Sequence, residues 1–203
     1  MGRSDPRLLP FYKKHIKPKG TVALLGFTDN KWFQGDLYDL QLNNWNINDK
    51  WELPKKYDTI ISLRCPYFSK DPEDFIARCH KSLNTGGKLY VDWGLGDHWR
   101  FKDYKIGWVK DGEHEFAYHE DNYLWSTVWD DSFMDDPEYK LFEQRVKKFN
   151  YINVKKVVYD QTPSVCEIKS VKKYFNLSYN MITLWEDNPQ LYILLSGVKQ
   201  KNE

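Results

Sequence analysis

Cysteine is scarce in this chain of 203 residues, and no long apolar run is present. The three cysteines, Cys65, Cys79 and Cys166, form no CxxC motif and cannot all pair, which argues against a disulfide scaffold and for a reducing compartment. No apolar run reaches the roughly 18 residues that a membrane-spanning helix needs. The first residues are charged and contain no apolar core of a signal peptide. We therefore expect a soluble, cytoplasmic protein with no membrane partner.

The chain also lacks an excess of either charge. Lys and Arg total 30 against 29 for Asp and Glu, which gives a formal net charge of +1. This balance excludes a polycationic protein that binds nucleic acid by phosphate neutralisation alone, although a local basic patch stays open. Hydrophobic residues make up 41% of the chain and no segment is repeated, so we expect one globular domain over residues 1–203.

Aromatic residues are abundant by contrast. Nine Trp, fourteen Tyr and eleven Phe make up 17% of the chain, and five of the tryptophans lie between Trp93 and Trp129. Large rings usually build a core, but they can also form a surface that stacks on flat ligands such as nucleobases. We expect residues 93–136 to be a Trp-rich insertion or lid within the domain.

Three continuous apolar runs predict strands that are buried on both faces, at 21–27, 58–63 and 88–92. The last two flank a helical pattern that ends in Gly86-Gly87, so they form a βαβ unit with a right-handed crossover. The sequence thus predicts an α/β, Rossmann-like, mostly parallel sheet with helices on both faces and these three strands adjacent and central. The patterns further predict helices at 5–16, 71–83, 137–149 and 164–175, and strands at 152–159 and 190–198.

Residues 57–93, YDTIISLRCPYFSKDPEDFIARCHKSLNTGGKLYVDW, carry a recognisable pattern. An acidic residue, an apolar strand, a D-P-x-x-x-hydrophobic helix start, L-x-x-G-G and a second apolar strand follow one another. The segment resembles the fourth strand, the following helix and the fifth strand of class I S-adenosylmethionine-dependent methyltransferases. The resemblance implies S-adenosylmethionine as cofactor and a small-molecule or nucleobase-containing methyl acceptor. It also makes the strands at 152–159 and 190–198 a closing hairpin at the sheet edge.

The segment after the first strand departs from that family. The family has a GxGxG-type loop there, whereas this chain has Gly26 and then no glycine until Gly35. Residues 27–36 leave no room for an ordinary helix, so either a βα unit is lost or residues 37–39 are a shortened second strand. The resemblance implies that Gly26 admits the cofactor, with Gly26→Leu sparing the fold if its φ is negative.

Three further residues are candidates for cofactor binding by the same resemblance. Asp39 would bind the ribose hydroxyls, Asp49 would lie near the adenine, and Arg64 would line the crevice at the strand ends. For both aspartates a solvated turn carboxylate is an equally good interpretation.

Two segments at strand ends carry the candidate catalytic residues. Arg64-Cys65-Pro66-Tyr67 is similar to the D/N-P-P-Y/F motif of amino-group methyltransferases, which implies that Tyr67 stacks on the acceptor. Cys65 replaces the polarising acid or amide, and a free cysteine packs more often than it attacks. After Asp92, His98 is a candidate general base and Arg100 a candidate anion ligand, unless this loop is an ordinary turn.

Two interpretations of function therefore stay open. One is a divergent methyltransferase, and the other is a non-catalytic ligand- or partner-binding module on the same scaffold. We expect no metal site. His114 and His119 are five residues apart, and at that spacing they would not share a face in a helix or in a strand.

Overall fold

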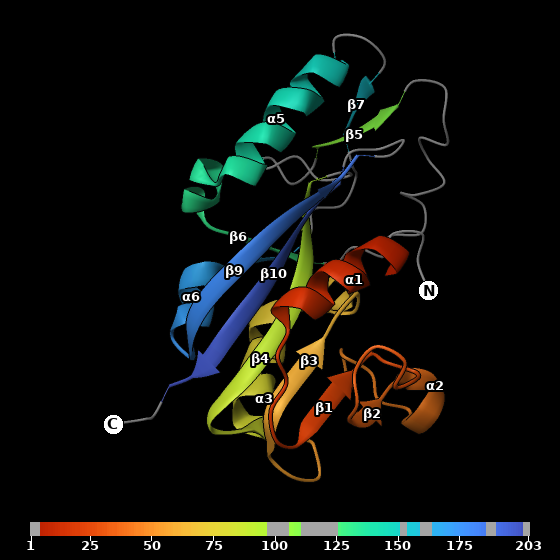
Figure 1. Ribbon diagram of the computed structural model, residues 1–203, viewed down its shortest axis with the longest axis vertical. Coiled ribbons are helices and arrows are strands. Elements are labelled where there is room, and N and C mark those ends of the chain that lie inside the picture. The colour runs from red at the N-terminus through yellow and green to blue at the C-terminus, as the bar shows by residue number, and fades with distance from the viewer. Residues whose placement is uncertain are drawn as a thin grey trace.

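The structure is a computed structural model, and it describes residues 5–96, 106–110, 126–150, 154–158, 164–185 and 190–200. Within these ranges the main sheet has six strands in the order β2-β1-β3-β4-β10-β9 (Figure 1). Strands β2, β1, β3 and β4 are parallel to one another, β10 pairs antiparallel with β4, and β9 pairs antiparallel with β10. Their bounds are β1 Val22–Leu25, β2 Asp36–Tyr38, β3 Tyr57–Ser62, β4 Leu83–Gly96, β9 Phe175–Leu184 and β10 Gln190–Lys199.

The predicted mostly parallel sheet is confirmed, with β1, β3 and β4 as adjacent strands inside it. The predicted helices at 5–16, 71–83 and 137–149 are also confirmed, as α1 Asp5–His15, α3 Pro72–Ser82 and α5 Pro137–Asn150. The remaining described helices are short: α2 Leu40–Asn43, α6 Ile168–Lys172, and the 3₁₀ helices η1 Pro66–Phe68 and η2 Asp131–Asp135. Two short strand pairs lie outside the main sheet. In one, β5 Ile106–Lys110 pairs with β7 Val154–Val158, and in the other, β6 Ser126–Trp129 pairs with β8 Ser164–Glu167.

Local sequence explains where α3 begins. The Asp71 carboxylate accepts a hydrogen bond from the Asp74 backbone N–H at 2.9 Å, which caps the first turn. Pro72 occupies the first helical position, where no backbone N–H is needed. Phe75, Ile76 and Cys79 are buried on one side of the helix. This cap and this apolar face place α3 against the sheet and make β3-α3-β4 a crossover unit.

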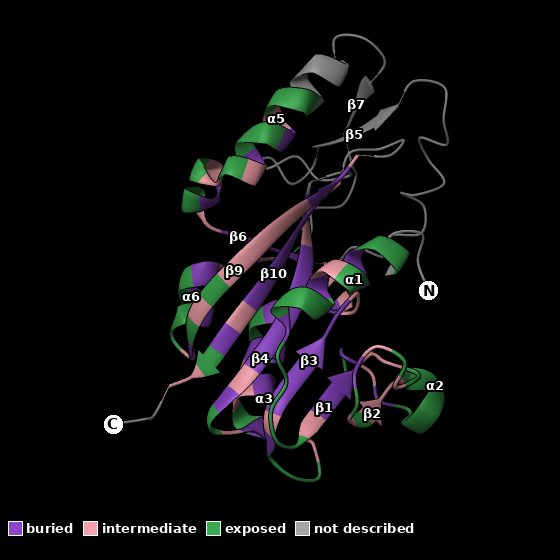
Figure 2. Cartoon of the chain, viewed as in Figure 1, coloured by how far each residue is buried: buried purple, intermediate pink, exposed green. Residues whose placement is uncertain are grey.

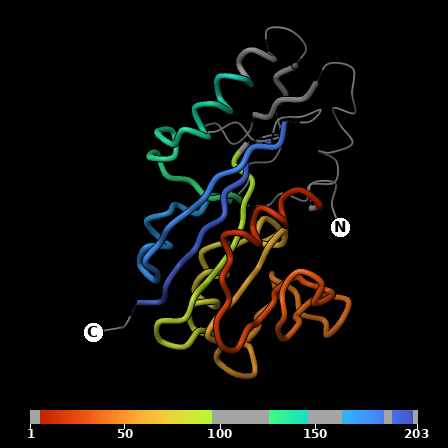
Figure 3. Tube along the Cα trace, viewed as in Figure 1, coloured from red at the N-terminus to blue at the C-terminus, as the bar shows by residue number. Residues whose placement is uncertain are grey.

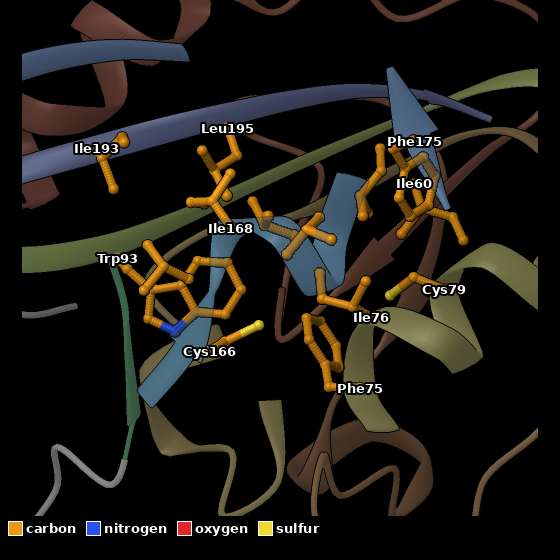
Figure 4. Packing of buried hydrophobic residues seen from close by; sticks show 14 of the residues in the cluster. Ile60, Phe75, Ile76, Cys79, Trp93, Cys166, Ile168, Phe175, Ile193 and Leu195 are labelled. Carbon is orange, nitrogen blue, oxygen red and sulfur yellow. The ribbon is translucent and has the colours of Figure 1, made fainter. Parts of the chain in front are cut away.

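The alternation of side chains along the central strands separates two apolar layers. Leu24, Ile61 and Tyr90 pack with the inner face of α1, whereas their neighbours Ala23, Ile60 and Leu89 pack in the layer that contains α3. Figure 2 shows the purple, buried strands between these layers. Figure 4 shows the α3 layer, where Trp93 of β4 and Cys166 of β8 lie among aliphatic side chains. Both faces of the central sheet are therefore covered, as predicted.

The closing hairpin is at a different place from the one predicted. Strand β10 pairs with β9 along its whole length, while β7 pairs with β5 outside the main sheet. The predicted helix at 164–175 is also wrong, because β8 comes first, α6 has five residues, and Phe175 already begins β9. Strand β9 is an edge strand in which Asn176, Ser178 and Asn180 alternate with apolar residues. A search for continuous apolar runs misses such a strand, because only one of its faces is buried.

No helix lies between β1 and β2, as the short spacing indicated. The connecting residues form a loop in which Phe33 is buried against the α1 layer, and Figure 3 traces this loop in orange. Residues 36–38 are the shortened second strand, in register with Ala23, Leu24 and Leu25 of β1. None of the described helices is long and apolar enough to cross a membrane.

Candidate functional site

The carboxyl ends of β1 and β2 are joined by a backbone hydrogen bond. The N–H of Gly26, the residue after β1, donates to the carbonyl of Tyr38 at 2.7 Å. Gly26 has φ +79°, in the left-handed region that favours glycine. The negative φ under which Gly26→Leu would spare the fold is therefore not present. The same hydrogen bond places Gly26 beside Asp39, which follows Tyr38.

Asp39 is the N-cap of α2. One of its carboxylate oxygens, Oδ1, accepts from the backbone N–H of Gln41 at 2.8 Å. Its own N–H donates to Oδ1 of Asn43 at 3.1 Å, which holds the turn in place. Within the described part of the chain, the second carboxylate oxygen has no hydrogen-bond partner, and the residue is half-buried. Asp39 therefore has an acceptor available at the end of β2.

Cys65 lies directly on Gly26. A Cβ placed on Gly26 would be 2.6 Å from Cys65 Cβ and 2.7 Å from its Sγ, so glycine is required here for space as well as for φ. Burial of the thiol, and after it the charges of Asp92 and Asp39, raise the pKa of Cys65 to about 12. The thiol is thus neutral at physiological pH, which favours packing over nucleophilic attack.

Arg64 and Asp92 join the ends of β3 and β4. The backbone N–H of Arg64 donates to Asp92 Oδ1 at 2.6 Å, and Arg64 Nη1 lies 3.7 Å from Oδ2. Arg64 has φ +58°, a left-handed conformation that is uncommon for a residue with a side chain. The Asp92 side chain is fully buried and that of Arg64 is 17% exposed. Although burial opposes the charge on Arg64, Asp92 outweighs it and the pKa of Arg64 is raised.

Aromatic rings surround this ion pair. The Arg64 guanidinium lies 5.1 Å from the centre of the Tyr67 ring and 4.8 Å from that of Tyr192. Tyr12 of α1 is fully buried beside Asp92, and burial followed by the charge of Asp92 raises the pKa of Tyr12. Neither Tyr12 nor Tyr192 was a sequence candidate. Tyr12 lies in α1 and Tyr192 lies in β10, both far along the chain from Arg64 and Asp92, so only the tertiary fold brings them there.

Two tryptophans of the predicted lid belong to the core instead. Trp93 is fully buried and its Nε1 donates to Ser126 Oγ at 3.3 Å, while that hydroxyl donates to the Pro66 carbonyl at 3.1 Å. Trp129 is 5% exposed. These two indoles are therefore unavailable to stack on an acceptor, and Trp93 is linked through Ser126 to Pro66 of η1.

The structure does not bring Asp49 to this cluster. Asp49 is exposed on a turn, where its N–H donates to the Asn46 carbonyl. The turn is tied to the segment after η1 through Asn48, whose side chain donates to Phe68 O and accepts from Lys70 N. His98 and Arg100 lie outside the described residues, and so does the stretch 113–120. Among the described residues, no three His, Cys, Asp or Glu side chains gather as metal ligands would.

The architecture is shared with solved structures, although sequence comparison finds nothing. No family profile matches the chain, and no curated protein matches it in sequence. A proposed S-adenosylmethionine-dependent methyltransferase from Listeria monocytogenes superimposes with a TM-score of 0.50 at 13% identity, over 95% of this chain and 98% of the other. The chain has the class I methyltransferase fold.

Two further matches are weaker. The N-methyltransferase NodS from Bradyrhizobium japonicum, in complex with S-adenosyl-L-homocysteine, gives a TM-score of 0.48 at 10% identity over 98% of this chain and 87% of that protein. Phosphoethanolamine N-methyltransferase 2 from Haemonchus contortus gives 0.46 at 10% identity, and the match spans 96% of this chain but 52% of that protein. The class I methyltransferase fold rests on the similarity to the Listeria protein. At 13% identity, that similarity concerns the fold alone.

Proposed function

We propose that this protein binds S-adenosylmethionine at the carboxyl ends of β1–β4 and transfers its methyl group to an acceptor. The observation that carries the proposal is that Gly26 with Cys65 against it, Asp39, and the Arg64–Asp92 pair all lie at that edge. Ligands of open α/β sheets bind outside the carboxyl ends of the strands. The Listeria protein that shares this fold is named as an S-adenosylmethionine-dependent methyltransferase, which supports this choice of cofactor.

The residues present fit the cofactor unevenly. Asp39 fits best, because its second carboxylate oxygen is available to accept from the ribose hydroxyls. Gly26 fits less well, because Cys65 already fills the space where a side chain would be. Arg64 is a cation at this edge and would face the carboxylate of the methionine part. Asp49 remains a candidate for the adenine side.

The chemistry supplied by the bound cofactor is methyl transfer from a sulfonium, an in-line displacement that mainly requires positioning. Tyr67 offers a half-buried ring at this edge, already oriented by Arg64 and by Phe68 at 4.4 Å between ring centres. It would hold a flat or small-molecule acceptor. We further propose that His98 accepts or steers the acceptor proton, that Arg100 assists, and that the segment after β4 covers the site within a single domain.

Binding is tested by calorimetry with S-adenosylmethionine on the intact protein and on Asp39→Asn. Asparagine caps a helix as well as aspartate does, so the variant keeps α2 and loses the charge. We expect the wild type to bind and Asp39→Asn to bind at least about tenfold more weakly, roughly 1.4 kcal/mol. Asp71→Asn changes the cap of α3 in the same way and is the matched control, with unchanged affinity. Absence of heat in the wild type at millimolar cofactor would overturn the proposal.

The alternative is a binding module on this fold that does not transfer methyl groups. Two observations favour it: the loop in place of a helix after β1, and the neutralised pair in which Asp92 is held by Arg64. Incubation of the protein with methyl-labelled cofactor and cell extract distinguishes the two functions. Label in an acceptor fraction, reduced roughly a hundredfold by His98→Ala with cofactor affinity retained, supports the enzyme. Cofactor binding without any labelled product supports the module.

A further inference from the structure

We propose that the indole N–H of Trp45 donates a hydrogen bond to the adenosine half of the cofactor. The inference rests on the proposed function and adds to it a residue that no sequence pattern singled out. It starts from a donor without an acceptor. Trp45 is 8% exposed, and its Nε1 is buried with no hydrogen-bond partner among the residues that the structure describes. Buried polar groups are nearly always paired, because an unpaired one loses its bond to water without compensation.

The position of Trp45 links this donor to the candidate cofactor site. The carbonyl of Asp39 accepts from the backbone N–H groups of Leu42, Asn43 and Trp45, at 3.2, 3.1 and 3.3 Å. Asn44, between the last two, has φ +55° and closes the turn. Trp45 is thus anchored to the same residue whose carboxylate is expected to bind ribose. A ligand held by Asp39 would have the Trp45 indole within the adjoining turn.

A neighbouring tryptophan provides the contrast. The rings of Trp45 and Trp51 lie 5.4 Å apart and belong to the same buried cluster. The Nε1 of Trp51 donates to the Ile47 carbonyl at 3.4 Å, so that indole has its partner within the protein. Within the described residues, only Trp45 of this pair lacks an acceptor, although the two have nearly equal exposure, 8% and 7%. The Nε1 of Trp32, in the loop after β1, is also buried without a partner there, so the contrast separates Trp45 from Trp51 and not from every indole.

The rest of the turn matches the chemistry of an adenosine group. Leu40 and Leu42 of α2 are 59% and 51% exposed, which is unusual for large apolar side chains and offers surface to a flat base. The ring nitrogens of adenine are hydrogen-bond acceptors, as an N–H donor requires. Because Nε1 is covered, the ligand reaches it only if a neighbouring segment moves. Helix α2 has four residues and none of them is buried, so its displacement breaks few contacts.

The test combines affinity with a direct view of the indole. Calorimetry with S-adenosylmethionine is carried out on the wild type, on Trp45→Phe and, as the matched control, on Trp51→Phe. We expect Trp45→Phe to weaken binding about tenfold, the equivalent of one hydrogen bond, and Trp51→Phe to leave affinity unchanged. In the ¹⁵N-labelled wild type, the Trp45 indole N–H resonance, assigned through its contacts with Trp51, should shift downfield when cofactor is added.

The outcomes distinguish the two proposals. If the wild type binds but Trp45→Phe binds equally well, or if the Trp45 indole resonance does not respond, the role of Trp45 is overturned and cofactor binding stands. If the wild type does not bind at all, both proposals fail. The resonance is measured on the unaltered protein, so the inference can still be decided if Trp45→Phe does not fold.

Discussion

The two ends of the parallel strands carry similar residues in different states. At the N-terminal edge, defined by Gly20, Thr21, Asp58 and Asn84, both oxygens of the Asp58 carboxylate are used. Oδ2 accepts from the N–H and the hydroxyl of Thr21, and Oδ1 accepts from Asn84 Nδ2 at 2.8 Å. Gly20 has φ +60°, and an added Cβ would lie 2.2 Å from Asp58 Oδ2.

The C-terminal edge, defined by Gly26, Asp39, Arg64, Cys65 and Asp92, also has a glycine with positive φ next to a packed side chain. Here one carboxylate, Asp92, is buried and paired, while Asp39 keeps an oxygen without a protein partner in the described part of the chain. The difference teaches that a carboxylate at a strand end is structural where the fold saturates it. It is a candidate ligand where the fold leaves an oxygen available.

The largest effect is expected from filling the glycine positions. Gly26→Ala should destabilise the fold, by about 1–2 kcal/mol for the left-handed backbone and about 1–3 kcal/mol for the overlap with Cys65. The free energy of unfolding in urea measures the sum. Adding Cys65→Gly should recover the overlap part only. A Gly26→Ala variant as stable as the wild type would contradict the contact between the two residues.

A smaller effect on stability is expected from Asp58→Asn, and it should exceed that of Asp39→Asn. Asp58→Asn removes charge from a carboxylate with three donors, so its melting temperature should fall below that of Asp39→Asn, which keeps its single capping bond. Cofactor affinity should show the reverse order. Equal melting temperatures and equal affinities for the two variants would remove the distinction between the edges.

The stability of the fold in acid should depend on Asp58 at the N-terminal edge. Hydrogen bonds from the Thr21 backbone, and next from Asn84, lower the pKa of Asp58 below its ordinary 3.8. The stability that Asp58 contributes is therefore complete above about pH 4 and is lost as the pH falls through its folded-state pKa. Urea unfolding between about pH 5 and 2 should show a shallower acid loss in Asp58→Asn than in the wild type. Parallel curves would show that the carboxylate is not stabilised by the fold.

The smallest effect is expected in the reactivity of the three cysteine thiols of the native protein. Burial raises the pKa of Cys65 and of Cys166 to about 12 and that of Cys79 well above its ordinary value. At pH 8 the thiolate fraction of Cys65 is then about a thousandfold below that of a thiol of pKa 9. A thiol reagent should label the native protein slowly and the unfolded protein at all three cysteines. Rapid labelling of native Cys65 would return it to consideration as a nucleophile.

Much of the fold was predictable because its signals are local. Continuous apolar runs identified β1, β3 and β4, and Asp71-Pro72 identified the start of α3. The edge strand β9 was missed, since its polar face removes the continuous run. Of the site, Gly26, Asp39 and Arg64 were named from their places after strands, and the structure brings them to one edge. Asp49 was named by the same reasoning, and the structure leaves it on an exposed turn.

The sequence by itself determined the βαβ unit, the absence of a helix between β1 and β2, and the order in which the strand-end residues follow one another. Those features depend on residues close in the chain, whose spacing fixes which element fits. Tertiary structure alone decided that Tyr12 lies beside Asp92, that Arg64 lies near Tyr192, and that the Trp45 indole has no acceptor among the described residues. Hydrogen bonding and burial depend on neighbours from distant segments, and only the packed sheet brings these together.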